Sequence, residues 1–376
     1  MKKRIILVLT LVVIVIVAMA LIPSKKGFED GVVKIGIISP VTGSGAGVYH
    51  EPLKKGIDIA LAEINKDGKK VEVVYEDDQL DSKLSLSAYN KLKNEGVKYF
   101  VLNGSPSASV VGPLVREDEN FSMVPSALLL SYKDNSPLTC RMALTADNYG
   151  PAFTDLFMNK LGKKKVATLI SNTEGGVAIQ KVFKEKFELA GGKVVVEELF
   201  DKDAVDFRTQ ILKIKANKDV EALVIINWSN TIETMLKQIK DLGLNVPIFS
   251  DSPTIKNAAL KNLSLAESVT FLDYSFSTSD SDTSPISEQF IKEYSARNNG
   301  DKPTIQAAQG YDLMKIITLA MENSDVSKPS SVANYIVNDI KDMQFAGGKF
   351  SFDNSCEAKR EIATRKVVNG AFAEIK

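Results

Sequence analysis

Two hydrophobic patterns alternate along most of the chain after residue 31. Short, mainly apolar runs of about four to eight residues are typical of buried strands. Longer segments place apolar residues three or four positions apart, which is the spacing of one helix face. Before Asp147 the predicted strands are Val32–Ser39, Val71–Tyr75, Tyr99–Leu102 and Met123–Val124, and the predicted helices are Leu53–Ile64, Lys83–Asn94 and Ala108–Glu119. This series predicts a parallel sheet with helices on both faces.

A second series of the same kind begins after Asp147. Its predicted helices are Tyr149–Leu161, Val177–Ala190, Phe207–Asn217 and Thr231–Leu242, and its predicted strands are Lys165–Ile170, Lys193–Glu198, Ala222–Ile226 and Pro247–Phe249. After Phe271 the pattern weakens, and Ser275–Pro285 is typical of a loop or crossover. Helices are then predicted at Ile286–Asn298, at Thr304–Met321 and near Ser331–Ile340, with a hairpin turn at Asn369-Gly370.

Two such series, joined near Asp147, predict an α/β protein with two lobes. The late segments are expected to return to the first lobe. We therefore predict lobe 1 over residues 32–146 and 275–360, and lobe 2 over residues 147–274 and 361–376, with a hinge between them. Ligands of open α/β sheets bind beyond the carboxyl ends of the strands, so these ends are expected to face each other across a cleft.

Residues 1–28 have a different character. The basic start Lys2–Arg4 precedes the run Ile5–Ile22, which is apolar except for Thr10. This run of about 18 residues reaches the lower limit for spanning a bilayer and exceeds the apolar core of a typical cleaved signal. Ala18-Met19-Ala20 nevertheless fits a cleavage site. We predict a signal peptide or an N-terminal membrane anchor, with the anchor favoured, and the positive-inside rule places the rest of the chain outside the cytoplasm.

Composition narrows the function classes. Lys plus Arg and Asp plus Glu both number 47, so no excess of positive charge points to nucleic acid. His50 is the single histidine, and Cys140 and Cys356 are the two cysteines, which makes a zinc or iron–sulfur site hard to build. A Ser-His-Asp triad would have to use His50, and no nucleophile-elbow motif is present. In an exported chain the two cysteines can form one disulfide, which their separation neither supports nor excludes.

The glycine-rich turn Thr42–Gly47 raises an enzymatic alternative. A strand, a glycine turn and a helix in this order are typical of a phosphate or dinucleotide site. The turn reads Gly43-Ser44-Gly45-Ala46-Gly47, which is not the G-x-G-x-x-G spacing, and the predicted helix begins only at Leu53. A nucleotide-dependent enzyme is therefore disfavoured, and we expect the turn to form one lip of a solute cleft instead.

Motifs spread from Val33 to Lys376 resemble those of one family of exported proteins. They are Pro40-Val41-Thr42-Gly43, the helix Gly56–Asn65, Tyr75-Glu76-Asp77-Asp78, Arg141 with Asp147 and Gly150, Phe290–Tyr294, Ala307–Asp312, Phe350–Asp353 and Val368-Asn369-Gly370. Their order and spacing resemble the branched-chain amino acid (Leu/Ile/Val) type of ABC-transporter substrate-binding protein. The resemblance implies the type I periplasmic binding fold, whose two lobes close around a small solute.

The same resemblance implies a function without catalysis. The protein would be the extracytoplasmic solute-binding component of an ABC importer, and it would bind an amino acid or a similar small polar or amphipathic solute. Its partners would be that solute and an ABC permease, with no cofactor, and the protein would be a monomer in the periplasm or at the cell surface. An alternative with the same fold is a ligand-sensing ectodomain that acts with a receptor partner, which an uncleaved anchor would suit.

In lobe 1 the resemblance points to five ligand-binding residues: Tyr49, Ser105, Ser107, Ser126 and Leu128. Helix N-terminal N–H groups with the hydroxyl of Ser105 or Ser107 can bind a carboxylate, and the alternative is that a serine caps the predicted helix. Ser126 and Leu128 match a second binding segment, but Leu128 replaces the usual threonine, so an ordinary strand end is the alternative. Tyr49 corresponds to an aromatic residue of the cleft, or else packs on its own loop.

In lobe 2 the resemblance points to the loops after two strands. Trp228, the only tryptophan, has polar neighbours and is expected to stack on the solute, with a core position as the alternative. Asp251 and Ser252 follow the next strand, where an acidic group can pair with a ligand ammonium or cap a helix. Gly175 replaces an aromatic residue of many relatives, which implies a wider cleft or a different ligand.

Overall fold

The computed structural model describes residues 27–28, 31–43, 45–127, 136–201, 203–257, 260–276, 278 and 284–375. Most of the predicted N-terminal segment and Leu128 lie outside these described residues. Within the described ranges, no helix is long and apolar enough to cross a membrane.

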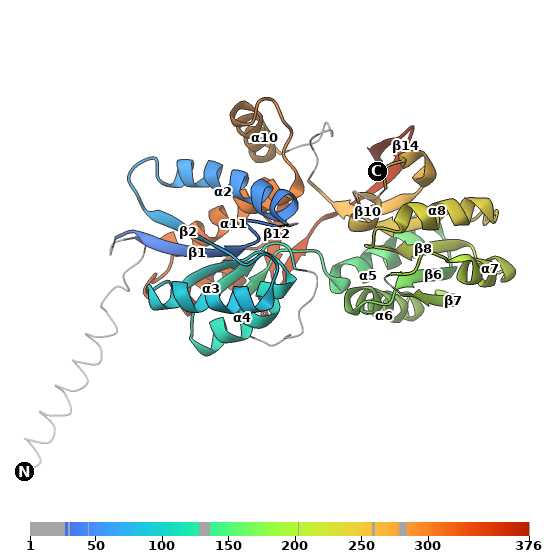
Figure 1. Cartoon of the computed structure of the whole chain (residues 1–376), viewed down its shortest axis with the longest axis horizontal. Helices are drawn as coiled ribbons and strands as arrows, with labels where there is room; N and C mark the ends of the chain where they lie inside the picture. Colours follow the sequence, from blue (N-terminus) through green and yellow to red (C-terminus); the bar gives the residue numbers. More distant parts are fainter. Residues whose placement is uncertain are drawn as a thin grey trace, which may run out of the picture.

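The first sheet is entirely parallel and lies in the left-hand body of Figure 1. Its order is β2-β1-β3-β4-β5, formed by β1 (Val33–Ser39), β2 (Val71–Asp77), β3 (Tyr99–Leu102), β4 (Phe121–Val124) and β5 (Thr139–Arg141). One face packs on α2 (Glu51–Ile64), α11 (Ile305–Glu322) and α12 (Pro329–Asp339). The other face packs on α3 (Ser82–Asn94) and α4 (Ser105–Glu117). The late helices thus complete the core of the first sheet.

Two glycines let α2 and α11 touch backbone to backbone. A Cβ added to Gly56 would lie 1.9 Å from the Ala307 carbonyl oxygen, and one added to Gly310 would lie 2.1 Å from the Leu53 carbonyl oxygen. Only glycine fits at such an approach. This contact explains why both helices carry a glycine in an otherwise apolar pattern.

The second sheet combines parallel and antiparallel strands. Its order is β15-β14-β10-β9-β8-β6-β7, formed by β6 (Lys165–Ser171), β7 (Lys193–Phe200), β8 (Ala222–Ile226), β9 (Ile248–Asp251), β10 (Thr270–Tyr274), β14 (Ile362–Val368) and β15 (Ala371–Glu374). The strands β6 to β10 are parallel, whereas β14 and β15 are antiparallel additions at one edge. The predicted hairpin at Asn369-Gly370 is confirmed, since both residues have positive φ and Val368 pairs with Ala371.

Helices cover both faces of the second sheet. One face packs on α5 (Ala146–Asp155), its π-helical continuation η2 (Leu156–Leu161) and α6 (Glu174–Leu189). The other face packs on α7 (Arg208–Ala216) and α8 (Ile232–Asp241), with the short helices α9 (Ser252–Ile255) and η3 (Leu263–Ala266) nearby. The predicted α/β fold with two lobes is therefore confirmed, with the antiparallel edge as an addition.

A small antiparallel sheet joins the first sheet near its β5 edge. It consists of β11 (Met343–Phe345), β12 (Gly348–Phe352) and β13 (Ala358–Arg360), and α10 (Pro285–Arg297) precedes it in the chain. The Arg141 N–H donates to the Cys356 carbonyl oxygen at 2.9 Å, and a disulfide joins Cys140 to Cys356 with 4.5 Å between the Cα atoms. Arg141 Nε also donates to Glu357 Oε2 at 2.7 Å. These contacts fasten the late strands to β5.

Several predicted helices, among them α5 and α6, begin earlier in the structure, and the two such starts that bear on the site are those of α4 and α2. Helix α4 begins at Ser105 instead of Ala108, because Pro106 in its first turn has a fixed helical φ and needs no N–H partner there. A π-helical turn η1 (Ala46–His50) precedes α2, so helical structure begins inside the glycine turn instead of at Leu53. The apolar spacing marks only the parts of a helix that face the core, so it missed both first turns.

The chain passes between the sheets three times, at residues 142–145 between β5 and α5, between β10 and α10, and at residue 361 between β13 and β14. Strand β5 ends where the first crossover begins, and β10 ends at Tyr274, opposite Ile362 of β14. The second and third crossovers therefore meet the second sheet at the carboxyl end of β10, and the Leu144 N–H of the first donates to the Tyr274 hydroxyl there at 3.3 Å. The carboxyl ends of the parallel strands of both sheets consequently lie on the side that faces the other body in Figure 1.

Removal of the disulfide gives a test of how the late strands are held. Replacing Cys140 and Cys356 together by serine should lower the free energy of unfolding by about 2–5 kcal/mol, because the bond closes a long loop in the unfolded chain. Equilibrium urea unfolding of the wild type and the double variant without reductant measures the difference. Equal stabilities would contradict this prediction.

Candidate functional site

A buried polar network links the carboxyl ends of three strands of the first sheet. Asn103 Nδ2 donates to Ser39 Oγ at 3.0 Å, and Ser126 Oγ donates to Asn103 Oδ1 at 2.7 Å. His50 Nδ1 lies 3.1 Å from the same Ser39 Oγ. Ser39, Asn103 and His50 are almost fully buried, and burial lowers the pKa of His50 below its usual value. The network therefore holds the ends of β1, β3 and β4 with a neutral imidazole.

The backbone of Tyr49 is hydrogen-bonded to this network. Its carbonyl oxygen accepts from Asn103 Nδ2 at 3.3 Å, and its ring is half-buried. The neighbouring His50 ring packs edge-on against Tyr75, with 5.3 Å between the ring centroids. The backbone of η1 is thus fixed while the Tyr49 side chain keeps part of its surface in solvent.

The two serines of the α4 start have different roles in the structure. Ser107 is buried, and its Oγ donates to the Gly104 carbonyl oxygen at 3.1 Å. Ser105 is the first helical residue and is half-buried. Neither serine is the N-cap, which is Gly104, and no side chain of the described residues caps this helix. The predicted capping alternative was wrong because the helix begins before both serines, and the first-turn N–H groups keep the positive end of the helix dipole.

In the second lobe, Trp228 and Asp251 are hydrogen-bonded to each other. Trp228 Nε1 donates to Asp251 Oδ2 at 2.7 Å, and the Thr254 N–H donates to Asp251 Oδ1 at 3.2 Å. Asp251 is fully buried and caps α9, while Ser252 is nearly buried in its first turn. Trp228 is half-buried and packs against the core beside α5 and α6. Asp251 therefore orients the indole ring and uses both of its oxygens inside the lobe.

The loop after β6 completes the carboxyl edge of the second sheet. Thr173 caps α6 by accepting a hydrogen bond from the Gly176 N–H at 3.2 Å. Gly175 lies buried in the same first turn. The Asn227 N–H, after β8, donates to Thr254 Oγ1 at 3.0 Å, which fixes the start of the Trp228 loop. Within the described chain, no hydrogen bond joins Trp228 or Asp251 directly to Ser105 or Tyr49.

Sequence reasoning missed the residues that hold the edge together. Ser39, Asn103 and Thr173 each end or follow a strand, His50 ends η1, and none is marked by an unusual motif. The signal that could have found the first two was a polar residue at the carboxyl end of an otherwise apolar strand. His50 could not be found in this way, because only the path of η1 brings it against Ser39.

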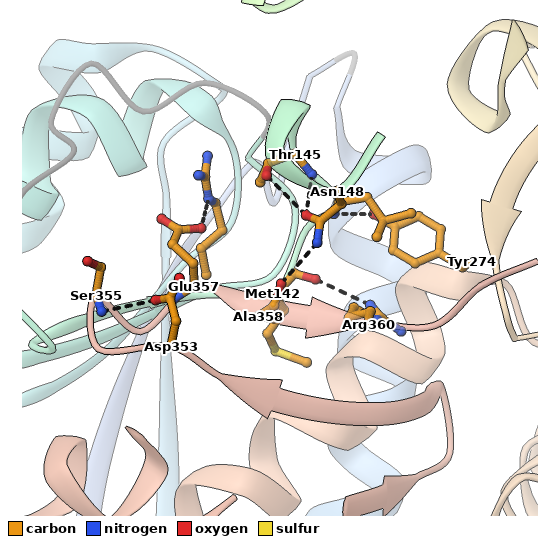
Figure 2. Close-up of polar contacts among 11 residues, drawn as sticks. Met142, Thr145, Asn148, Tyr274, Asp353, Ser355, Glu357, Ala358 and Arg360 are labelled. Carbon is orange, nitrogen blue, oxygen red and sulfur yellow. Dashed lines mark hydrogen bonds and ion pairs between the residues drawn. The ribbon is translucent and has the colours of Figure 1, made fainter. Parts of the chain in front are cut away.

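The crossovers between the lobes have their own polar contacts, which Figure 2 shows. Thr145 and Asn148 form a capping box at the start of α5, and Asn148 Nδ2 donates to the Ala358 carbonyl oxygen at 3.4 Å. The Leu144 N–H donates to the Tyr274 hydroxyl at 3.3 Å. The first crossover is therefore hydrogen-bonded to the elements that lead into the other two.

No metal-type cluster appears in the part of the chain that the structure describes. Groups of three or more His, Cys, Asp or Glu side chains that could hold a metal ion are absent there. Hydroxyls, amides and helix N–H groups lie at the two carboxyl edges beside the His50 imidazole and the Asp251 carboxyl, and such groups suit a small polar solute.

Comparison with known proteins decides the family. The sequence profile of the family described as periplasmic binding protein matches residues 32–368. The chain belongs to this family. The predicted resemblance is thereby confirmed, and the branched-chain type is represented among its relatives. The leucine-, isoleucine-, valine-, threonine- and alanine-binding protein of Pseudomonas aeruginosa is 26% identical over 307 residues, which cover 80% of this chain and 81% of the relative.

Solved structures of this family share the fold. The branched-chain amino acid transporter substrate-binding protein of Streptococcus pneumoniae, solved with isoleucine, matches with a TM-score of 0.73 at 23% identity, covering 92% of this chain and 99% of that one. A solute-binding protein of an ABC transporter from R. palustris, solved with benzoate, matches with a TM-score of 0.72 at 18% identity, covering 92% and 96%. The periplasmic binding protein thus has the two-lobed fold of proteins crystallised with different solutes.

The buried Asp251 carboxyl gives a pH-dependent prediction. Burial raises its pKa to about 6, so between about pH 4 and pH 6 the folded chain binds a proton more strongly than the unfolded chain. This part of the free energy of unfolding is therefore present at low pH and is lost as the pH rises through that window. Asp251→Asn should remove this pH dependence. It should also lower the free energy of unfolding by about 1 kcal/mol at every pH, because one hydrogen bond is lost.

Urea unfolding between pH 4 and pH 7 measures this difference. Asp241→Asn, at an exposed position in the last turn of α8, is the matched control. If Asp251→Asn and wild type have parallel pH profiles, the buried carboxyl does not titrate as described.

Proposed function

We propose that this periplasmic binding protein is the solute-binding component of an ABC importer and takes an amino acid or a similar small amphipathic solute. One observation carries the proposal: the carboxyl ends of both sheets lie on the side of the three crossovers, and each end bears an aromatic residue beside polar groups. Such an arrangement suits a solute held between two lobes that close on it. The protein acts by binding and release, without catalysis.

In this proposal lobe 1 binds first. The uncapped start of α4, with the Ser105 hydroxyl, accepts a carboxylate or another electron-rich group of the solute. Tyr49 covers the solute from the η1 turn, which the Asn103 network holds in place. Ser126, whose hydroxyl donates to Asn103, lines the floor next to the network.

Lobe 2 contributes on closure. The half-buried indole of Trp228, oriented by Asp251, stacks on the apolar part of the solute. Ser252 stands next to this pair at the start of α9. A solute shifts the equilibrium toward the closed form only by its additional contacts with lobe 2 in that form. A permease that recognises the closed form would then receive loaded protein.

The predicted export follows from the same assignment. The N-terminal segment directs the chain across the membrane and either anchors it or is cleaved. At the described end of that segment, the Gly27 N–H donates to the Ser324 carbonyl oxygen at 3.0 Å, beside the C-terminal end of α11. An anchor would therefore attach to lobe 1 and leave lobe 2 able to move. We propose a monomer.

A thermal-shift and fluorescence screen tests the function. Leucine, isoleucine, valine, other amino acids, amides, nucleosides and small acids such as benzoate are the probes. A true solute at 100 times its Kd should stabilise the protein by about 2.7 kcal/mol and should change the fluorescence of Trp228. A clear shift with NAD and none with the other probes would contradict the importer assignment and favour the nucleotide-dependent alternative.

The two serines of α4 test the binding mode. Ser105→Ala should weaken binding of the best solute in the screen by about 10-fold or more, because a hydrogen bond to a charged group is lost. Ser107→Ala is the matched control in the same turn, since its hydroxyl is already bonded to Gly104. Titration calorimetry on both variants, with their melting temperatures, separates binding from folding. Equal affinities of Ser105→Ala and wild type would remove Ser105 from the site.

A further inference from the structure

Arg360 is a buried arginine at the last residue before the third crossover. Its side chain is 9% exposed and lies between two aromatic rings, with the guanidinium carbon 4.7 Å from the Tyr274 ring centroid and 4.2 Å from that of Phe350. Nη1 donates to the Met142 carbonyl oxygen at 3.3 Å, and Nη2 donates to the Gly347 carbonyl oxygen at 2.7 Å. These contacts come from three segments: the stretch after β5 gives Met142, β10 gives Tyr274, and the β11–β12 hairpin gives Gly347 and Phe350.

These contacts connect all three crossovers. Met142 belongs to the first crossover, Tyr274 immediately precedes the second, and Arg360 itself leads into the third. The Tyr274 hydroxyl also accepts from the Leu144 N–H at 3.3 Å, so the first crossover is bonded to both members of the stacked pair. Figure 2 shows Tyr274 and Arg360 side by side next to the Thr145–Asn148 capping box.

The buried charge of Arg360 is compensated through the backbone of Ala346 and Gly347. The Gly347 carbonyl accepts from Arg360, while the Gly347 N–H donates to Asp312 Oδ2 at 2.7 Å and the Ala346 N–H donates to Asp312 Oδ1 at 2.8 Å. Asp312 lies on α11 and is fully buried. The guanidinium is therefore fixed from the lobe 1 core, because a buried charge needs complementary partners held in place.

The geometry points to the Arg360–Tyr274 pair as the contact that holds the three crossovers together at the hinge, and we call this pair the pin. By joining the crossovers at one place, the pair restricts the angles that the two lobes can adopt and sets the ratio of open to closed forms without solute. This inference rests on the proposed closure of the lobes. Arg360 is a positioning residue, and its contacts with Met142, Tyr274, Gly347 and Phe350 involve none of the residues that we propose to touch the solute.

Arginine is required by this role for a geometric reason. A planar guanidinium can stack between two rings and at the same time donate in its plane to carbonyls of two segments. A lysine at this position keeps the positive charge but offers no plane to stack. Arg360→Lys should therefore release the pin although the charge is retained, and Tyr274→Phe should remove the hydroxyl contacts with Leu144 and Gln309 while keeping the ring.

Pulsed electron paramagnetic resonance on the full chain tests the pin. Nitroxide labels at Asn90→Cys in α3 and Thr209→Cys in α7 report the distance between exposed sites on the two lobes. Without solute, Arg360→Lys should broaden the distance distribution, and Tyr274→Phe should change the ratio of its open and closed components by about fivefold, the effect of one buried hydrogen bond.

Gln238→Ala is the matched control. Gln238 is a nearly buried polar residue of lobe 2 that bonds the Phe207 N–H and the Val205 carbonyl oxygen, away from the crossovers. It should lower stability without widening the distribution. An equal broadening in the control, or unchanged distributions in both hinge variants, would overturn the pin. If Arg360→Lys does not fold, Tyr274→Phe decides.

A further measurement separates this inference from the proposed function. Isoleucine, leucine and benzoate are added to the labelled protein that carries the native hinge. Failure of all probes to shorten the distance would count against closure on such solutes. The pin would then still be tested by comparing the distance distributions of the hinge variants and the wild type without solute.

Discussion

The direction of parallel strands is the constraint on which the rest of this molecule depends. In each sheet, the parallel strands end at one edge, and their loops and helix N-termini gather there. The chain crosses between the sheets at the same edge, beyond β5 and β10. A different direction of crossing would have placed the polar loops of the two lobes far apart. One topological choice therefore places the candidate site and the hinge next to each other.

Polar groups at these edges serve two physically different purposes. Asn103 and Asp251 are buried and use their side chains on neighbours inside their own lobes, because a buried polar group without a partner is costly. Their partners, the η1 backbone and the Trp228 indole, retain surface that can meet a solute. Buried residues thus hold partly exposed ones in fixed positions before the solute arrives, and such preorganisation lowers the entropy cost of binding.

Most of the architecture could be predicted, and the exceptions have a common cause. Tyr99–Leu102 and Ala222–Ile226 were predicted with the bounds that the structure has, since short apolar runs between turn residues leave few alternatives. The starts of α4 and η1 were missed because their residues follow no apolar period. Ser105 and Trp228 could be proposed only by resemblance. The support from Ser39, His50 and Asn103 depends on contacts between segments far apart in the chain, which no local pattern encodes.

The sequence by itself determined the strand and helix order, the two-lobed class and the family to which the chain belongs. The order and the class follow from hydrophobic periodicity and turn chemistry, which act over a few residues, and the family follows from the resemblance of its motifs. Only the tertiary structure decided that Cys140 meets Cys356, that Asp251 supports Trp228, and that Arg360 lies between Tyr274 and Phe350. Each of these contacts joins segments at least 10 residues apart, and most of them far more, so it forms only after the sheets and their crossovers have fixed where the segments lie.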